Sequence, residues 1–111
     1  MPRQSSLPHK SAILIAEAGP LKGKSFNLLS NSSYLIGREG DIKIPEEDMT
    51  ASRKHAHITF ENDHFVIYDL ESKNHTYVND EMVNSKALFD GDIIIIGISI
   101  FRFILKDEEH N

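Results

Sequence analysis

The sequence predicts a single all-β domain, either a sandwich or a barrel, on three observations. Its length of 111 residues is ordinary for one domain. Apolar runs of about five residues recur about every ten residues, are rich in β-branched and aromatic side chains, and are separated by turn residues. No window of about twelve residues places apolar side chains at helical spacing, so we expect strands rather than helices.

The N-terminal half contains four expected strands, each ended by turn residues. AILIAEA runs into the turn GPLKGK, and SFNLL runs into the polar segment SNSS. YLIG ends at a glycine, and DIKI alternates apolar and polar residues until a proline stops it. The expected ranges are 12–18, 25–29, 34–37 and 41–44.

The C-terminal half contains five further expected strands. In HAHITF, successive side chains point to opposite faces, so Ala56, Ile58 and Phe60 share one face. His55 and His57 then share the other face. The turn ENDH separates this strand from FVIYDL, the loop ESKNHT leads into TYVN, and IIIIG and SIFRFIL complete the domain. The expected ranges are 55–60, 65–70, 76–79, 93–97 and 99–105.

The two ends of the chain differ in composition from the domain between them. Residues 1–10 include two prolines and predict a flexible N-terminal tail, and residues 107–111 predict a charged C-terminal tail, which leaves 11–106 as the domain. The N-terminus lacks the apolar segment of a signal peptide, and no apolar run is long enough to cross a membrane. We therefore expect a cytoplasmic protein, or a cytoplasmic module of a longer one. We also expect the isolated domain to be monomeric.

Composition narrows the class of function. The net charge of −5 disfavours broad binding to nucleic acid or to an anionic membrane, both of which need a basic face, so we expect neither as a partner. The absence of cysteine excludes a disulfide framework and a thiolate metal site. A local basic cluster would nevertheless be specific on an otherwise acidic surface.

Such a cluster lies in three loops, at 37–40, 45–54 and 71–76. If these loops converge at one end of the sandwich, they form a pocket rich in hydrogen-bond donors with up to four positive charges. A phosphate monoester, with about −1.5 to −2 charges and three acceptor oxygens, needs such donors, above all an exposed arginine. The side chains concerned are Arg38, Ser52, Arg53, Lys54, Lys73, Asn74 and Thr76.

Two other kinds of site can be drawn from the same residues. His55 and His57 have a spacing that can hold a metal, but no third ligand is evident. Ser52, His55 and Asp69 could form a hydrolytic triad, but no nucleophile elbow is present and no helix follows the serine. We therefore expect no metal, no cofactor and no catalysis.

Four segments, in this order, resemble the forkhead-associated (FHA) domain family: LIGR at 35–38, SRKHA at 52–56, DLESKNHTYVN at 69–79 and LFDGDIIIIG at 88–97. The resemblance covers about residues 12–105. It implies an eleven-stranded β-sandwich of FHA type, with two antiparallel or mixed sheets, that binds phosphothreonine peptides through loops at one end.

The resemblance also implies roles for single residues. Those implied to bind phosphate are Arg38, Ser52, Arg53 and Lys54. Those implied to bind the peptide backbone are Asn74 and Lys73. Those implied to shape the loops are Gly37, His55, Thr76 and Asn79, the last two by bracing the loop that carries Asn74. The chain has His75 where the family usually has a glycine, a position that favours a positive φ.

The expected function is a non-enzymatic module for phosphothreonine-dependent protein–protein recognition in signalling. The alternatives are a phospho-independent FHA interaction domain and the regulatory domain of a larger signalling enzyme. The acidic run PEED at 45–48 is either a solvated loop or a rim that repels peptides with acidic flanks.

Overall fold

The computed structural model of the protein describes residues 10–107. Within this range the chain forms eleven strands in two sheets and no helix. The predicted eleven-stranded β-sandwich is therefore confirmed. No helix in the described part of the chain could span a membrane.

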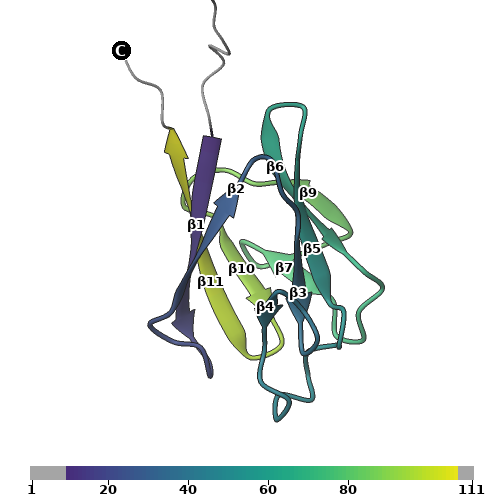
Figure 1. Cartoon of the computed structure of the whole chain (residues 1–111). Helices are drawn as coiled ribbons and strands as arrows, with labels where there is room; N and C mark the ends of the chain where they lie inside the picture. The colour runs from purple at the N-terminus through teal and green to yellow at the C-terminus, as the bar shows by residue number, and fades with distance from the viewer. Residues whose placement is uncertain (1–9, 108–111) are drawn as a thin grey trace, which may run out of the picture.

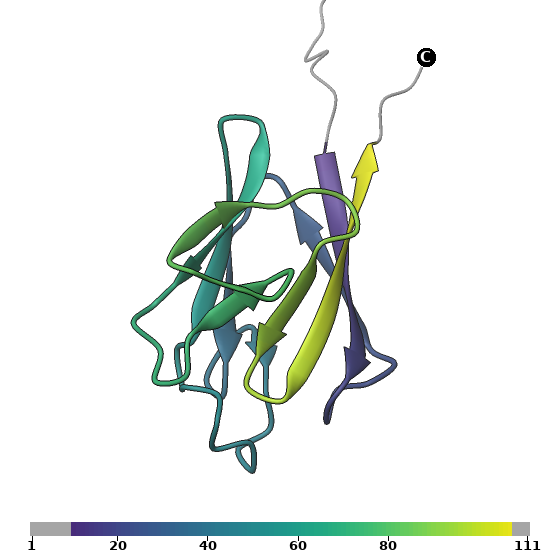
Figure 2. The ribbon, with the colours of Figure 1, turned by 180° about the vertical axis from the view of Figure 1, so that it is seen from behind.

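The two sheets face each other as two layers, as both ribbon views show (Figures 1 and 2). Neighbouring strands pair antiparallel, except for one parallel pair, β3 with β4. The six-stranded sheet has the order β2 (Ser25–Leu29), β1 (Lys10–Ala18), β11 (Ser99–Asp107), β10 (Ile93–Ile96), β7 (Thr76–Val78) and β8 (Glu81–Val83). The five-stranded sheet has the order β4 (Ile42–Lys43), β3 (Tyr34–Gly37), β5 (Ala56–Glu61), β6 (His64–Asp69) and β9 (Ser85–Ala87).

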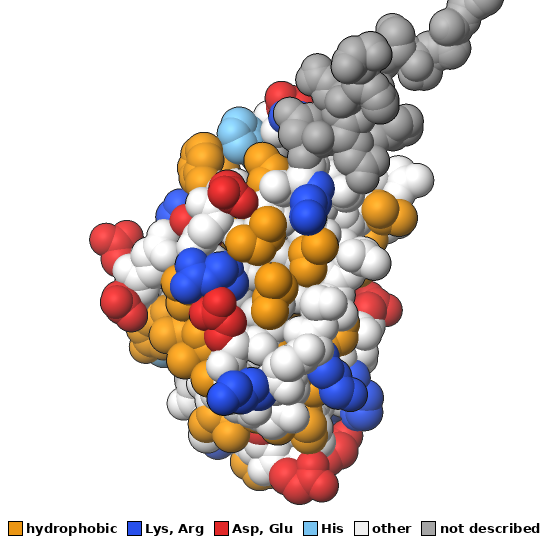
Figure 3. Space-filling view, turned by 90° about the vertical axis from the view of Figure 1, so that its left-hand side faces the viewer, with side chains coloured by type: hydrophobic (Ala, Val, Ile, Leu, Met, Phe, Trp, Pro, Cys, Tyr) orange, Lys and Arg blue, Asp and Glu red, His pale blue; other side chains and the backbone are white. Residues whose placement is uncertain are grey.

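The core lies between the sheets and is built from alternate residues of the long strands. Phe65 from one sheet and Phe103 from the other are buried, and their ring centroids are 5.8 Å apart in an edge-to-face contact. Truncating a buried phenylalanine of this kind to alanine typically costs about 3–5 kcal/mol. The outer face of the six-stranded sheet is mixed, with apolar side chains in its middle and charged ones around them (Figure 3).

All nine strands expected from the sequence are present; two have the expected ends, and the ends of the others differ by at most two residues. The alternation pattern was wrong at one position: β5 begins at Ala56, and His55 before it is completely buried, so His55 does not share an outer face with His57. β8 and β9 were not expected. Each has three residues, and their side chains are mostly exposed or half-buried, so neither shows a clear apolar pattern.

The predicted tails lie largely outside the described residues. Lys10 belongs to β1 and Asp107 to β11, so these two residues, placed in the tails from the sequence, are part of the six-stranded sheet. The start of β1 and the end of β11 lie at one end of the sandwich (Figure 1). The loops that follow β3, β4 and β6 lie at the other end, where the candidate site is found.

Candidate functional site

The turn after β3 is held against the loop that follows β4. Gly37 ends β3, and a Cβ atom there would lie 2.2 Å from the carbonyl oxygen of Arg53, so only glycine fits. The backbone N–H groups of Arg38 and Glu39 donate hydrogen bonds to the carbonyl oxygens of Ser52 (3.2 Å) and Arg53 (2.9 Å). The glycine therefore allows two loops of the candidate site to share backbone hydrogen bonds.

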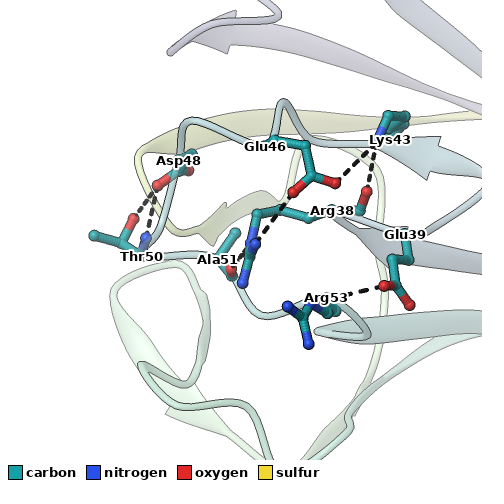
Figure 4. A network of polar contacts seen from close by, with 8 residues as sticks. All are labelled: Arg38, Glu39, Lys43, Glu46, Asp48, Thr50, Ala51 and Arg53. Carbon is teal, nitrogen blue, oxygen red and sulfur yellow. Dashed lines mark hydrogen bonds and ion pairs between the residues drawn. The ribbon is translucent and has the colours of Figure 1, made fainter.

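The side chain of Arg38 packs against this second loop and is only 12% exposed. Its Nε donates to the carbonyl oxygen of Ala51 at 2.9 Å, and its Nη1 lies 3.4 Å from Oε1 of Glu46 (Figure 4). Lys43 Nζ donates to the carbonyl oxygen of Arg38 at 2.6 Å. The sequence predicted that this arginine would be exposed, and that prediction is wrong. The side chain is largely buried because its guanidinium bonds the neighbouring backbone.

His55 is completely buried and joins the loops that contain Ser52 and His75. The backbone N–H of Ser52 donates to His55 Nδ1 at 3.0 Å, so Nδ1 is an acceptor. His55 Nε2 lies 2.8 Å from the carbonyl oxygen of His75, and because a carbonyl oxygen only accepts, Nε2 carries the proton. Both ring nitrogens are thus bonded to backbone, which leaves neither of them free for a metal.

The metal site and the triad drawn from the sequence are not assembled. The ring of His57 packs against Tyr68, with 5.1 Å between ring centroids, away from His55. The imidazole of His55 meets the backbone N–H of Ser52 rather than its hydroxyl, so it is not placed to take the hydroxyl proton. Within residues 10–107, no three His, Cys, Asp or Glu side chains form a group that could hold a metal ion.

The hydroxyl of Ser52 and the amide of Asn74 lie where the second and third loops meet. Ser52 Oγ accepts a hydrogen bond from the backbone N–H of Lys73 at 3.0 Å, so its own proton is left to donate. Asn74 Nδ2 donates to the carbonyl oxygen of Thr50 at 2.9 Å. His75 has φ of 69°, the positive value that its place in the sequence predicts. The loop after β6 therefore adopts its shape without glycine.

A half-buried carboxylate, that of Asp69, fixes the base of this loop through a network of hydrogen bonds. Thr76 is completely buried, and its hydroxyl donates to Oδ1 of Asp69 at 2.7 Å. Ser72 donates to the same carboxylate from both its hydroxyl and its backbone N–H. Burial raises the pKa of Asp69, but these hydrogen bonds outweigh it, so the pKa lies below its usual value of 3.8. A charged Asp69 thus stabilises the turn before Asn74.

Asp48 fixes the loop after β4, a role not expected from the sequence, in which Asp48 belongs to an acidic run expected to be either a solvated loop or a rim that repels peptides with acidic flanks. It is 6% exposed, and Oδ2 accepts a hydrogen bond from the backbone N–H of Ile98, in the turn after β10, at 3.2 Å. Oδ1 accepts bonds from the backbone N–H and hydroxyl of Thr50. Burial raises the pKa of Asp48, but these bonds outweigh it and lower the pKa overall. The spacing Asp-x-Thr, typical of a side-chain-capped turn, was the available signal.

The remaining predicted cations lie on the rim. Arg53 is 68% exposed and its Nε lies 3.7 Å from a carboxylate oxygen of Glu39 (Figure 4). Lys54 and Lys73 are exposed on the loops that follow β4 and β6. The candidate site is therefore one largely buried arginine, one serine hydroxyl and three exposed cations, with carboxylates in contact with two of the four cations.

Asn79 does not brace the loop that carries Asn74. It lies just beyond the opposite end of β7, where its Nδ2 donates to Asp92 Oδ1 at 2.9 Å and its Oδ1 accepts from the backbone N–H of Ile93 at 3.0 Å. Three extended residues separate the two ends of β7 by about 10 Å. This part of the expected role is corrected: Asn79 joins β7 to the start of β10.

With this geometry in view, comparisons with known proteins identify the class. The sequence model of the FHA domain matches residues 34–97. The glycogen accumulation regulator GarA of Mycobacterium tuberculosis is 43% identical over 91 residues, which cover 82% of this chain and 56% of GarA. The chain belongs to the FHA domain family, and it spans about half the length of this relative.

Solved structures agree with this assignment. An FHA domain from a structural and functional analysis of phosphothreonine-dependent FHA interactions has a TM-score of 0.74 at 30% identity, covering 91% of this chain and 98% of that one. Mycobacterium tuberculosis EmbR, in complex with a low-affinity phosphopeptide, has a TM-score of 0.75 at 30% identity. That match covers 91% of this chain and 26% of EmbR.

Proposed function

We propose that the domain recognises phosphothreonine in a partner protein through the loops that follow β3, β4 and β6. The observation that carries the proposal is the setting of Arg38. Its guanidinium is held by Ala51 beside the loop that presents the Ser52 hydroxyl. The phosphopeptide bound to the related EmbR supports the same ligand class here.

Each group at the site has a chemical task in this proposal. Arg38 presents Nη atoms that can donate parallel hydrogen bonds to two phosphate oxygens, which a lysine cannot reproduce. Ser52 donates its remaining hydroxyl proton to a third oxygen. Arg53 and Lys54, on the exposed rim, add positive charge and attract the phosphate at longer range.

The peptide main chain is recognised by the neighbouring loop. Asn74 uses one amide hydrogen on Thr50 and keeps a second hydrogen and its carbonyl oxygen for the peptide backbone. Lys73 lies beside it on the same exposed loop. The residues that hold the binding loops in shape, without contacting the peptide, are Gly37, His55 and Thr76. Asn79 lies away from these loops and stabilises the pairing of β7 with β10.

We further propose that the domain acts as a non-catalytic, cytoplasmic adaptor in a regulatory pathway and that it binds as a monomer. The name of GarA as a regulator supports the regulatory part. The imidazole of His55, bonded on both sides to backbone, supports the non-catalytic part, because it is not placed to activate the Ser52 hydroxyl.

Titration with a degenerate phosphothreonine peptide library, with a dephosphorylated copy as control, tests the proposal. We expect micromolar affinity for the phosphorylated library, which corresponds to about −8 kcal/mol, and no measurable binding of the control. Equal heats for both libraries in calorimetry would reject phosphothreonine recognition.

A further inference from the structure

Glu46 contacts the arginine on which the proposed phosphate site depends. Its Oε1 lies 3.4 Å from Arg38 Nη1, and its Oε2 lies 3.6 Å from Lys43 Nζ (Figure 4). A carboxylate thus lies beside a guanidinium nitrogen that a phosphate oxygen would need. Both the carboxylate and the phosphate are anionic acceptors for the same donor, so they compete for it.

The two partners of this ion pair are exposed to different degrees. The side chain of Glu46 is 63% exposed, whereas that of Arg38 is 12% exposed. Moving Glu46 into solvent therefore takes little packing away, while moving Arg38 would break its contact with the loop. The glutamate is the partner that can leave.

The position of Arg38 does not depend on Glu46. Nε donates to Ala51 at 2.9 Å, the backbone N–H donates to Ser52, and the carbonyl oxygen accepts from Lys43. These three hydrogen bonds hold the side chain and the backbone of the arginine in place without the glutamate. Glu46 therefore adds negative charge to the site rather than shape.

We propose that Glu46 is the internal counter-ion of the phosphate site, an affinity-determining residue that leaves Arg38 when phosphate binds. The inference rests on the proposed function. In the free domain Arg38, Lys43 and Glu46 carry a combined charge of +1, from two cations and one carboxylate. Bound phosphate takes the place of Glu46 on Arg38, and Glu46 keeps Lys43 as its partner.

The domain therefore binds phosphate less tightly than Arg38 alone would allow. Because Glu46 is 63% exposed, solvent screens its pair with Arg38 and the pair is weak, so its removal changes affinity by a small factor, about two- to fivefold. Screening weakens exposed charge pairs, so the factor shrinks as salt rises.

Fluorescence anisotropy titrations of the 111-residue chain with the degenerate phosphothreonine library test this role. Glu46→Gln removes the charge and nearly keeps the shape, and Glu46→Ala is a second variant. Glu47→Gln is the matched control, because Glu47 is exposed, one residue away, and has the same charge. Thermal melts establish that each variant is folded, and titrations are run at low and at high salt.

We expect both Glu46 variants to bind about two- to fivefold tighter than wild type and Glu47→Gln at low salt. If wild type binds and the Glu46 variants match Glu47→Gln, the counter-ion role is overturned and the proposed function stands. If wild type fails to bind while the Glu46 variants bind, Glu46 blocks the site completely. That result supports the counter-ion role and overturns the proposal that the wild-type domain recognises phosphothreonine. If none of the proteins binds the phosphorylated library, both are overturned.

Discussion

His55 offers the sharpest test of how the loops are held, because its contribution to stability can be worked out from its contacts. The side chain is completely buried and makes one hydrogen bond to Ser52 N–H and one to the carbonyl oxygen of His75. Losing two such bonds costs about 1–3 kcal/mol, and the cavity left by the imidazole adds to this. We expect His55→Ala to lower the free energy of unfolding by about 2–4 kcal/mol.

The loss should be visible in a thermal melt. A change of 1 kcal/mol shifts Tm by about 4–8 °C in a domain of this size, so the expected fall is about 8–32 °C. His57→Ala is the control, since His57 is only half-buried and contacts Tyr68 on the outer face of the sheet. We expect that control to cost about 1 kcal/mol or less.

Urea denaturation and a phosphopeptide titration of the same samples complete the experiment. Peptide affinity should fall with His55→Ala, because the loops with Ser52 and His75 are no longer joined. If unfolding free energy stays within about 0.5 kcal/mol of wild type, the argument from the two hydrogen bonds is wrong. Lost binding with unchanged stability would make His55 a direct contact to the ligand.

Two further substitutions follow from the loop after β6. Because His75 has φ of 69°, His75→Gly should raise the free energy of unfolding by up to about 1 kcal/mol and keep peptide binding, measured by urea titration and calorimetry. A clear loss of affinity would show that the imidazole itself contacts the ligand. The pKa of Asp69 is lowered in the folded state, so its stabilisation is present above the unfolded value of 3.8 and is lost as pH falls below it. Asp69→Asn should therefore destabilise the domain near neutral pH and flatten the loss of stability in acid. Melts from pH 7 down to about pH 2 would reveal both effects, and an acid limb identical to that of wild type would contradict this.

The sequence predicts the sandwich well because the residue pattern of each long strand is enough to identify it as a strand. In β5 and β6, alternation of apolar and polar side chains marks which face is buried, and turn residues mark the ends. β8 and β9 escape prediction because three-residue strands whose side chains are exposed or half-buried need no apolar pattern; their neighbours in the sheets specify them.

The sequence predicts that the three loops converge, and hydrogen bonds join them in the structure, but it predicts less of the geometry within them. Alternation alone placed His55 on an outer face, but its two backbone partners come from loops 3 and 20 residues away in sequence. The burial of Arg38 depends on Ala51, and the contact with Glu46 depends on how the loop after β4 folds back. Such contacts arise from the convergence of loops, for which local sequence carries no periodic signal.

Asn79 is a second case in which the sequence does not predict the contacts of a residue: a structural role was expected, but the segment that it supports was not. The family resemblance implies a loop role for Asn79, yet the direction of β7 decides which loop its side chain can reach. The strand carries it away from Asn74 and towards Asp92. A motif position therefore predicts that a residue is structural more securely than it predicts which segment the residue supports.

The central claim is that Arg38 binds the phosphate through its guanidinium. Its most direct test is a titration of wild type, Arg38→Lys and Arg38→Ala with matched phosphorylated and unphosphorylated peptides, with Lys106→Ala, exposed on β11, as the control for lost charge. Removing one partner of a buried, hydrogen-bonded charge pair costs about 2–5 kcal/mol, or about thirty-fold to several-thousand-fold in affinity. We expect Arg38→Ala to abolish measurable binding, Arg38→Lys to recover only part of it, and Lys106→Ala to bind like wild type. Because Arg38 also bonds Ala51, the titrations are run well below the Tm of each variant. Equal affinity of wild type and both Arg38 variants for the phosphorylated peptide would contradict the account.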